Sequence, residues 1–318
     1  MAHFAALYSR LICINGSEAV TAKVRPSSQL EKSSHNDGAR CMIKDILVSL
    51  PVGATSSDAA VDYAISVATG FDAHLAGLAL TYQPYVPGNV FNGVAANIVA
   101  SYRAQLEKAS KDAIAKFDAA ARRAGVSAQS HLLETELARI DELFAQTARQ
   151  FDLSVVAQIE PGKANPEEVL PETALFGSGR PVVVVPYIQK TGMKLDRVLV
   201  CWDGSRAATR ALGDAMPFLA RSKSIDIVTI ARNEEPLDEL PGVDVAHHLA
   251  RHKLKVEFKR IVAKDSDVTS IILSTAADLD SDMIVMGGYG HSRLREFVLG
   301  GATRGILKAM TVPVLMSH

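Results

Sequence analysis

The feature that most constrains this chain is an internal repeat. One unit opens with the apolar run at residues 43–50 and the other with the run at 195–202, and each run is followed by a capped, alanine-rich amphipathic segment and then by a second apolar run. Short apolar runs that alternate with segments of period 3.6 predict strands and helices in alternation. Both units therefore open with the same β-α-β motif.

The two units also end alike. Residues 151–156 and 180–184 of the first unit correspond to residues 281–286 and 311–315 of the second, and all four segments are short and apolar. Continuous apolar strands joined by helical crossovers are typical of a parallel sheet covered on both faces. We therefore predict an α/β fold made of two tandem doubly wound parallel-sheet domains, which are Rossmann-like.

This pattern divides the chain into three segments. We expect a first domain at residues 42–188, a second at 194–318, and a poorly ordered extension at 1–41 that is polar and shows no sustained period of two or of 3.6. The character of the sequence changes abruptly at Met42. Two interpretations stay open: the native chain starts at Met42, or the extension is a genuine flexible arm.

Composition and charge exclude several classes of protein. The chain is 48% hydrophobic and 22% charged, and its 34 Lys and Arg residues nearly balance its 35 Asp and Glu residues, for a formal net charge of -1. Such a balance argues against nucleic acid and against a membrane surface as partners. No run of 18 apolar residues and no secretory leader pattern occurs, so we expect a cytoplasmic protein. Three cysteines are too few for a disulfide framework or a four-ligand zinc site.

Two segments of the second unit are candidates for ligand binding, because ligands bind such sheets at the carboxyl ends of the strands, where the strand order reverses. One is the turn Asp203-Gly204-Ser205. The other follows the apolar run that ends at Met286, begins with Gly287 and is rich in glycine at both ends. Glycine lets backbone N–H groups approach phosphate oxygens, and a helix starting at the second glycine cluster would favour an anion through its dipole.

The glycine spacing resembles that of a known family. Gly287, two residues, Gly290, nine residues and Gly300, together with the Asp-Gly-Ser turn and the terminal Val-Pro-Val strand, resemble the universal stress protein family in tandem, over about residues 42–318. The resemblance implies a fold like that of the adenine nucleotide alpha hydrolases and a ligand that is ATP or AMP, with or without a magnesium ion. Gly301 stands where ATP-binding members carry Ser or Thr, and Thr303 is the candidate replacement.

The residues expected to bind the nucleotide all lie in the second domain, at the carboxyl ends of its strands or in the glycine loop. They are Asp203, Gly204, Ser205, Val228, Met286, Gly287, Gly290, His291, Ser292, Gly300, Gly301, Ala302 and Thr303. His291 and Ser292 would add side-chain donors. Asp203 would accept from a ribose hydroxyl or the adenine amino group, and a helix-capping role for it is equally open. No catalytic residue or metal ligand is assigned, and His248 and His252 are interpreted as a solvent-exposed helix face.

The first domain departs from this loop pattern. Pro51 stands where the second domain has Asp203, and Glu160 stands where it has Gly290, so that a carboxylate would occupy the place of phosphate. We therefore expect the first domain to be structural and to bury the surface that family members bury as dimers, which makes one chain a pseudo-dimer. Whether the chain also forms a homodimer stays open.

The resemblance implies a stress-response protein that binds ATP or AMP in its second domain and acts as a regulatory module with an unidentified protein partner. Two alternatives are kept. One is an interaction scaffold that binds no nucleotide, and the other is a slow ATPase with a water near Ser292 or Thr303. The sequence contains no Walker loop, no dinucleotide-binding turn after the first strand of either unit and no nucleophile elbow. We therefore do not expect an enzyme, beyond weak ATP hydrolysis.

Overall fold

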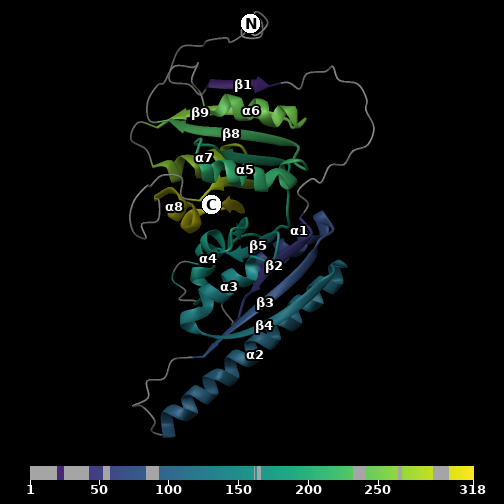
Figure 1. The fold of residues 1–318 in the computed structure, drawn as a ribbon, viewed down its shortest axis with the longest axis vertical. Helices are drawn as coiled ribbons and strands as arrows, with labels where there is room; N and C mark the ends of the chain where they lie inside the picture. The colour runs from purple at the N-terminus through teal and green to yellow at the C-terminus, as the bar shows by residue number, and fades with distance from the viewer. Residues whose placement is uncertain are drawn as a thin grey trace, which may run out of the picture.

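The computed structural model describes most of the chain as strands that alternate with helices (Figure 1). The described residues are 20–24, 43–52, 58–83, 93–160, 162, 166–231, 241–263, 267–288 and 301–318. Within these ranges, no helix combines the length and the apolar character that crossing a bilayer requires.

Most strands are the apolar runs seen in the sequence. The described strands are β1 (Val20–Val24), β2 (Asp45–Leu50), β3 (His74–Gln83), β4 (Ala128–Glu136), β5 (Leu153–Ala157), β6 (Val182–Val185), β7 (Arg197–Cys201), β8 (Ser224–Ala231), β9 (Val256–Val262), β10 (Met283–Gly287) and β11 (Val314–Ser317). Every residue of β6 and of β11 is buried. Strands with no polar face can be stable only when helices cover both sides of the sheet.

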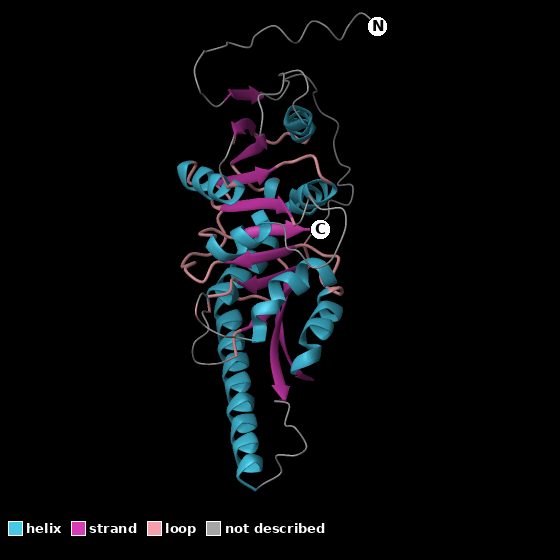
Figure 2. Ribbon diagram, turned by 90° about the vertical axis from the view of Figure 1, so that its left-hand side faces the viewer, coloured by secondary structure: helices cyan, strands magenta, loops and turns pink. Residues whose placement is uncertain are grey.

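The helices supply this cover. They are α1 (Ala59–Phe71), α2 (Gly93–Ala124), α3 (Ile140–Ala148), α4 (Leu170–Gly177), α5 (Arg206–Leu219), α6 (Pro241–Arg251), α7 (Val268–Asp278) and α8 (Gly301–Ala309), with short 3-10 turns η1 (Leu137–Arg139) and η2 (Pro166–Val169). The buried side chains of α1, α2, α5 and α6 form one apolar cluster, and those of α3, α4, α7 and α8 form another. The two clusters lie on opposite faces of the sheet, and Figure 2 shows helices on both sides of the strands.

All described strands belong to a single 11-stranded sheet in the order β1-β9-β8-β7-β10-β11-β6-β5-β2-β3-β4. Neighbours pair in parallel within β6-β5-β2-β3-β4 and within β9-β8-β7-β10-β11. The two halves have the same internal order, so that β2, β3, β4, β5 and β6 correspond to β7, β8, β9, β10 and β11. The predicted α/β fold with parallel strands is confirmed.

The two halves meet where β6 and β11 pair antiparallel, with Val183 opposite Leu315. This contact joins the two expected sheets into one (Figure 1). It also relates the halves by an approximate two-fold axis, and the carboxyl edge of one half therefore lies beside the amino edge of the other. The position of the domain boundary stays a prediction.

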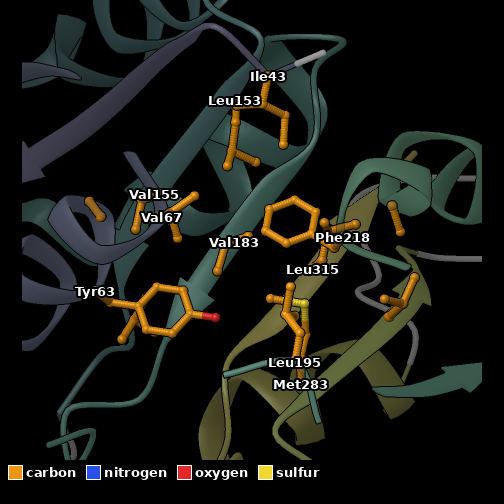
Figure 3. Packing of buried hydrophobic residues seen from close by; sticks show 14 of the residues in the cluster. Ile43, Tyr63, Val67, Leu153, Val155, Val183, Leu195, Phe218, Met283 and Leu315 are labelled. Carbon is orange, nitrogen blue, oxygen red and sulfur yellow. The ribbon is translucent and has the colours of Figure 1, made fainter. Parts of the chain in front are cut away.

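Aromatic side chains fill the junction between the halves. The ring of Phe71 in α1 meets that of Phe218 in α5 edge to face, with centroids 4.9 Å apart, and the Arg221 guanidinium lies 4.0 Å from the Phe71 centroid. Figure 3 shows Phe218 beside Leu315 of β11, opposite the side chains that the first half contributes. Because α1 and α5 are corresponding helices, this contact is the one that two separate copies of the repeat would make around a two-fold axis.

The extension before residue 42 contains one described element. Strand β1 pairs antiparallel with β9, with Ala22 opposite Phe258. No regular element was expected at residues 1–41, because the antiparallel partner that β9 provides lies far away in the sequence.

Candidate functional site

The candidate site lies where strands β7 and β10 end side by side. These strands pair in parallel, with Val285 opposite Val200. From β7 the chain crosses over to β8 on one side, whereas β10 is followed by β11 on the other side. The strand order thus reverses between β7 and β10, and a doubly wound sheet has its binding crevice at the carboxyl ends of such a pair.

After β7, the Asp203-Gly204-Ser205 turn leads into α5. The Ser205 N–H donates to Asp203 Oδ1 over 2.9 Å, and Gly204 has a φ of +73°, which glycine adopts without strain. Ser205 caps the helix, because its Oγ accepts from the Ala208 N–H over 3.1 Å. The cap of α5 is therefore Ser205, and Asp203 shapes the turn while its side chain stays exposed.

At the end of β10, close packing leaves little room for a side chain at two glycines. A Cβ on Gly287 would lie 2.5 Å from the backbone nitrogen of Ala208, in the first turn of α5. A Cβ on Gly288 would lie 2.6 Å from Leu175, which comes from α4 of the first half. The glycine pair thus lets the end of β10 pack closely against α5 at Gly287 and against the first half of the chain at Gly288.

The far end of the glycine loop enters α8 at Gly301. Gly301 is exposed, and a Cβ there would meet no atom within 4 Å. Ala302 is half-buried, whereas Thr303 is 3% exposed and has contacts of its own. Burial limits the access of a ligand to the Thr303 hydroxyl. Four other predicted residues, Gly290, His291, Ser292 and Gly300, lie outside the described residues.

Two predicted residues are in the core. Val228 is 1% exposed and Met286 is 6% exposed, and both belong to the apolar cluster that α7 and α8 cover. The carbonyl of Val228 accepts from the Trp202 N–H over 2.8 Å. The side chains of Val228 and Met286 therefore support the floor of the site, with no open surface for a ligand.

A hollow beside the turn contains two arginines that the sequence analysis missed. It has a volume of about 530 Å³ and is lined by Gly204, Arg206, Thr209, Arg210, Gly213 and Asp214. Arg210 Nε donates to Asp214 Oδ2 over 2.8 Å, and its Nη2 donates to the carbonyl of Gly179 in the first half over 3.4 Å. Arg206 is exposed at the first position of α5. The signal in the sequence was a pair of arginines four residues apart, directly after the Asp-Gly-Ser turn.

Among the described residues, neither a reactive thiol nor a metal cluster accompanies this site. Burial, with a smaller effect of the Asp203 charge, raises the pKa of the Cys201 thiol to about 12, so that it stays protonated at neutral pH. His248 and His252 are exposed, with ring centroids 4.9 Å apart. In the part of the chain that the structure describes, no three His, Cys, Asp or Glu side chains are grouped to hold a metal ion.

Comparison with known proteins assigns a family to the second half. The model of the universal stress protein family matches residues 194–318. A curated universal stress protein of Synechocystis sp. is 28% identical over 142 residues, which are 43% of this chain and 46% of that protein. The match thus spans about half the length of this relative.

Solved structures share the fold of both halves. A universal stress protein from Archaeoglobus fulgidus DSM 4304 aligns with a TM-score of 0.63 and 14% identity, over 87% of this chain and 97% of that chain. A protein from Pseudomonas aeruginosa PAO1, described as functionally unknown, aligns with a TM-score of 0.51 and 14% identity, over 87% of this chain and 93% of its own. At these identities the likeness establishes the fold alone.

Proposed function

Because residues 194–318 form a universal stress protein domain, we propose that this half binds an adenine nucleotide, ATP or AMP, and that the chain acts in the stress response as a nucleotide-dependent regulatory module. The observation that carries the proposal is the position of the Asp203 turn and the first turn of α8. The Asp203 turn directly follows β7, and α8 lies on the connection from β10 to the parallel strand β11, so the topology directs both to the carboxyl edge where the strand order reverses. A nucleotide has two ends of different chemistry, and this edge offers a different group to each.

The start of α8 suits the phosphate end. The first N–H groups of a helix have no partner within the helix, and its dipole places partial positive charge there. Gly301 adds no side chain that would keep a phosphate away. Arg206, beside Gly204, adds a full positive charge at the neighbouring hollow.

The Asp203 turn suits the sugar or base end. Asp203 Oδ1 already accepts from the Ser205 N–H, and the carboxylate is exposed. A carboxylate oxygen has further lone pairs, and it can therefore accept from ribose hydroxyls or the adenine amino group as well. The two ends of the site thus complement a nucleotide, whereas a free phosphate would use only one of them.

Titration calorimetry with ATP and with AMP, with and without magnesium, tests the proposal on the full chain. The decisive variants differ only at Gly301. Gly301→Asp places a carboxylate where phosphate would sit, yet an acidic residue in the first turn favours the helix, so the fold should persist. We expect this variant to bind at least about tenfold more weakly. Gly301→Ser is the matched neutral control and should bind as tightly as the wild type or tighter.

Two results would overturn the proposal. A wild-type chain that binds neither nucleotide would favour an interaction scaffold. Equal nucleotide affinities of Gly301→Asp and Gly301→Ser would show that the phosphate does not bind at the start of α8.

A further inference from the structure

The two ends of the sheet differ in what covers the outermost parallel strand of each half. Strand β9 of the second half pairs with β1, whereas its counterpart β4 pairs with β3 alone among the described residues. Strand β4 is nine residues long and contains no proline or lysine, the residues that natural proteins often use to protect a free edge. An edge of this length, with its two carboxylates Glu134 and Glu136 confined to the carboxyl end, can accept another strand.

The backbone phase of β4 is fixed by its pairing with β3. The Leu75 N–H donates to the Ser127 carbonyl over 2.9 Å, so odd-numbered residues of β4 direct their backbone groups toward β3. Even-numbered residues therefore direct their N–H and C=O groups outward, and Leu132, the middle residue of the strand, is one of them. Its side chain is 39% exposed.

Helix α2 packs on one face of β3 and β4. Phe117 of α2 lies over Gly77 of β3, because a Cβ on Gly77 would be 2.7 Å from the Phe117 ring. Ser130 of β4 lies 3.5 Å from Asp118 at the same helix. The helix thus packs on the face of β3 and β4, and Figure 1 shows it running along these two strands at the end of the sheet.

We propose that β4 pairs antiparallel with β4 of a second copy of this chain, around a two-fold axis at Leu132. In this register the outward-facing residues oppose one another as hydrogen-bonded pairs. The pairs are Leu132 with Leu132, Ser130 with Glu134, and Ala128 with Glu136. No like charges face each other directly, and the two half-exposed leucines cover each other.

The chain already contains a contact of this kind. Strands β6 and β11 join the two halves edge to edge and antiparallel, and the corresponding helices α1 and α5 meet on one face beside them. Pairing of β4 with its copy would repeat that arrangement at the other end of the first half. The sheet would then continue from one chain into the next.

Sedimentation velocity of the full chain over a range of concentrations tests the proposal. We expect the wild type to reach twice the chain mass of 34.0 kDa. Leu132→Lys places two ammonium groups opposite each other on the axis and should raise the dimer dissociation constant about tenfold or more. Gln129→Lys is the matched control, since it adds the same charge to the same strand but faces Thr135 of the second copy.

Cross-linking tests the register. With a short bismaleimide, Leu132→Cys should give a covalent dimer well above the wild-type background of native cysteines. Gln129→Cys should not, because the two copies of residue 129 would lie about 20 Å apart along the strands. A wild type that stays monomeric, equal dissociation constants for the two lysine variants, or more cross-linking at 129 than at 132 would each overturn the proposal.

Discussion

Gln158, directly after β5 in the first half, donates from its Nε2 to the carbonyl of Leu307 in α8 of the second half over 3.1 Å. Its Oε1 accepts from the Tyr187 N–H over 3.4 Å, and the residue is 4% exposed. The repeat places Gly288 at the corresponding position of the second half, and Leu175 of the first half packs against Gly288. One polar and one apolar contact thus occupy equivalent positions across the junction, and the polar one holds the helix whose first turn borders the candidate site.

Replacing Gln158 should weaken the junction. Gln158→Ala leaves the Leu307 carbonyl and the Tyr187 N–H without this partner in a buried place, so we expect the free energy of unfolding to fall by about 1–3 kcal/mol. Urea unfolding followed by circular dichroism measures the change. Gln189→Ala is the control, since it loses a bond to Thr191 in an exposed turn and should change stability by less than about 0.5 kcal/mol. Equal effects of the two variants would mean that water replaces the Gln158 bonds.

Gly287→Ala should destabilise the chain, because the added methyl group would meet backbone atoms of Ala207 and Ala208 that cannot rotate away. The strand and α5 would have to separate, at a cost of about 1–3 kcal/mol. Gly213→Ala is a sharp control: Gly213 is exposed within α5, a Cβ there meets no atom within 4 Å, and alanine favours a helix. Thermal melting should thus shift down for Gly287→Ala and up for Gly213→Ala. An unchanged melting temperature for Gly287→Ala would show that β10 and α5 are less closely packed.

The sequence was sufficient to predict those parts of the fold that are apolar on both faces. Strands such as β6 and β10 are continuous buried runs, and the repeat indicated their equivalence. The sequence was not sufficient to predict β4 and β9, because neither strand is a continuous apolar run. In β9 buried residues alternate with partly exposed ones that include Glu257 and Lys259, and β4 is mostly exposed. Strands β4 and β9 are the outermost parallel strands of their halves and contain more polar residues than the central strands, and this polarity hides them from a search for apolar runs.

The candidate site was predictable only where one half builds it. The Asp203 turn and the start of α8 follow from local sequence, because glycine and a helix-capping serine have specific backbone roles. The contact of Leu175 with Gly288 and the bond from Arg210 to the Gly179 carbonyl depend on the antiparallel junction. No pattern within either repeat states which edge of one half faces which edge of the other. The contact of Arg210 was missed for this reason, whereas Arg206 directly follows the turn and could have been found from the local sequence.

Tyr63→Phe should leave the chain equally stable or make it more stable. Tyr63 is 1% exposed, and its hydroxyl has no hydrogen-bond partner among the described residues, although Figure 3 shows it directed toward the second half. Burial raises the pKa of this hydroxyl above its usual range. Removing an unsatisfied buried hydroxyl while keeping the ring should raise the free energy of unfolding by up to about 1 kcal/mol. Tyr63→Leu, which also removes ring packing, should lower it. A loss of stability in Tyr63→Phe would indicate a bound water at the hydroxyl.

The thiol of Cys201 should make stability fall at alkaline pH. Burial raises its pKa from 9.0 to about 12, so the unfolded chain releases this proton at a lower pH than the folded chain. The unfolded state then binds fewer protons, and the free energy of unfolding must decrease as pH rises through this window, by up to about 1.4 kcal/mol per pH unit. Cys201→Ala removes this component but keeps the contribution of every other titrating group. Urea unfolding at a series of pH values should therefore show that the free energy of unfolding declines less steeply with pH for Cys201→Ala than for the wild type. The packing lost in the variant should add a difference that does not depend on pH. Two parallel curves would show that the thiol has an ordinary pKa in the folded chain and that solvent reaches the end of β7 beside Asp203.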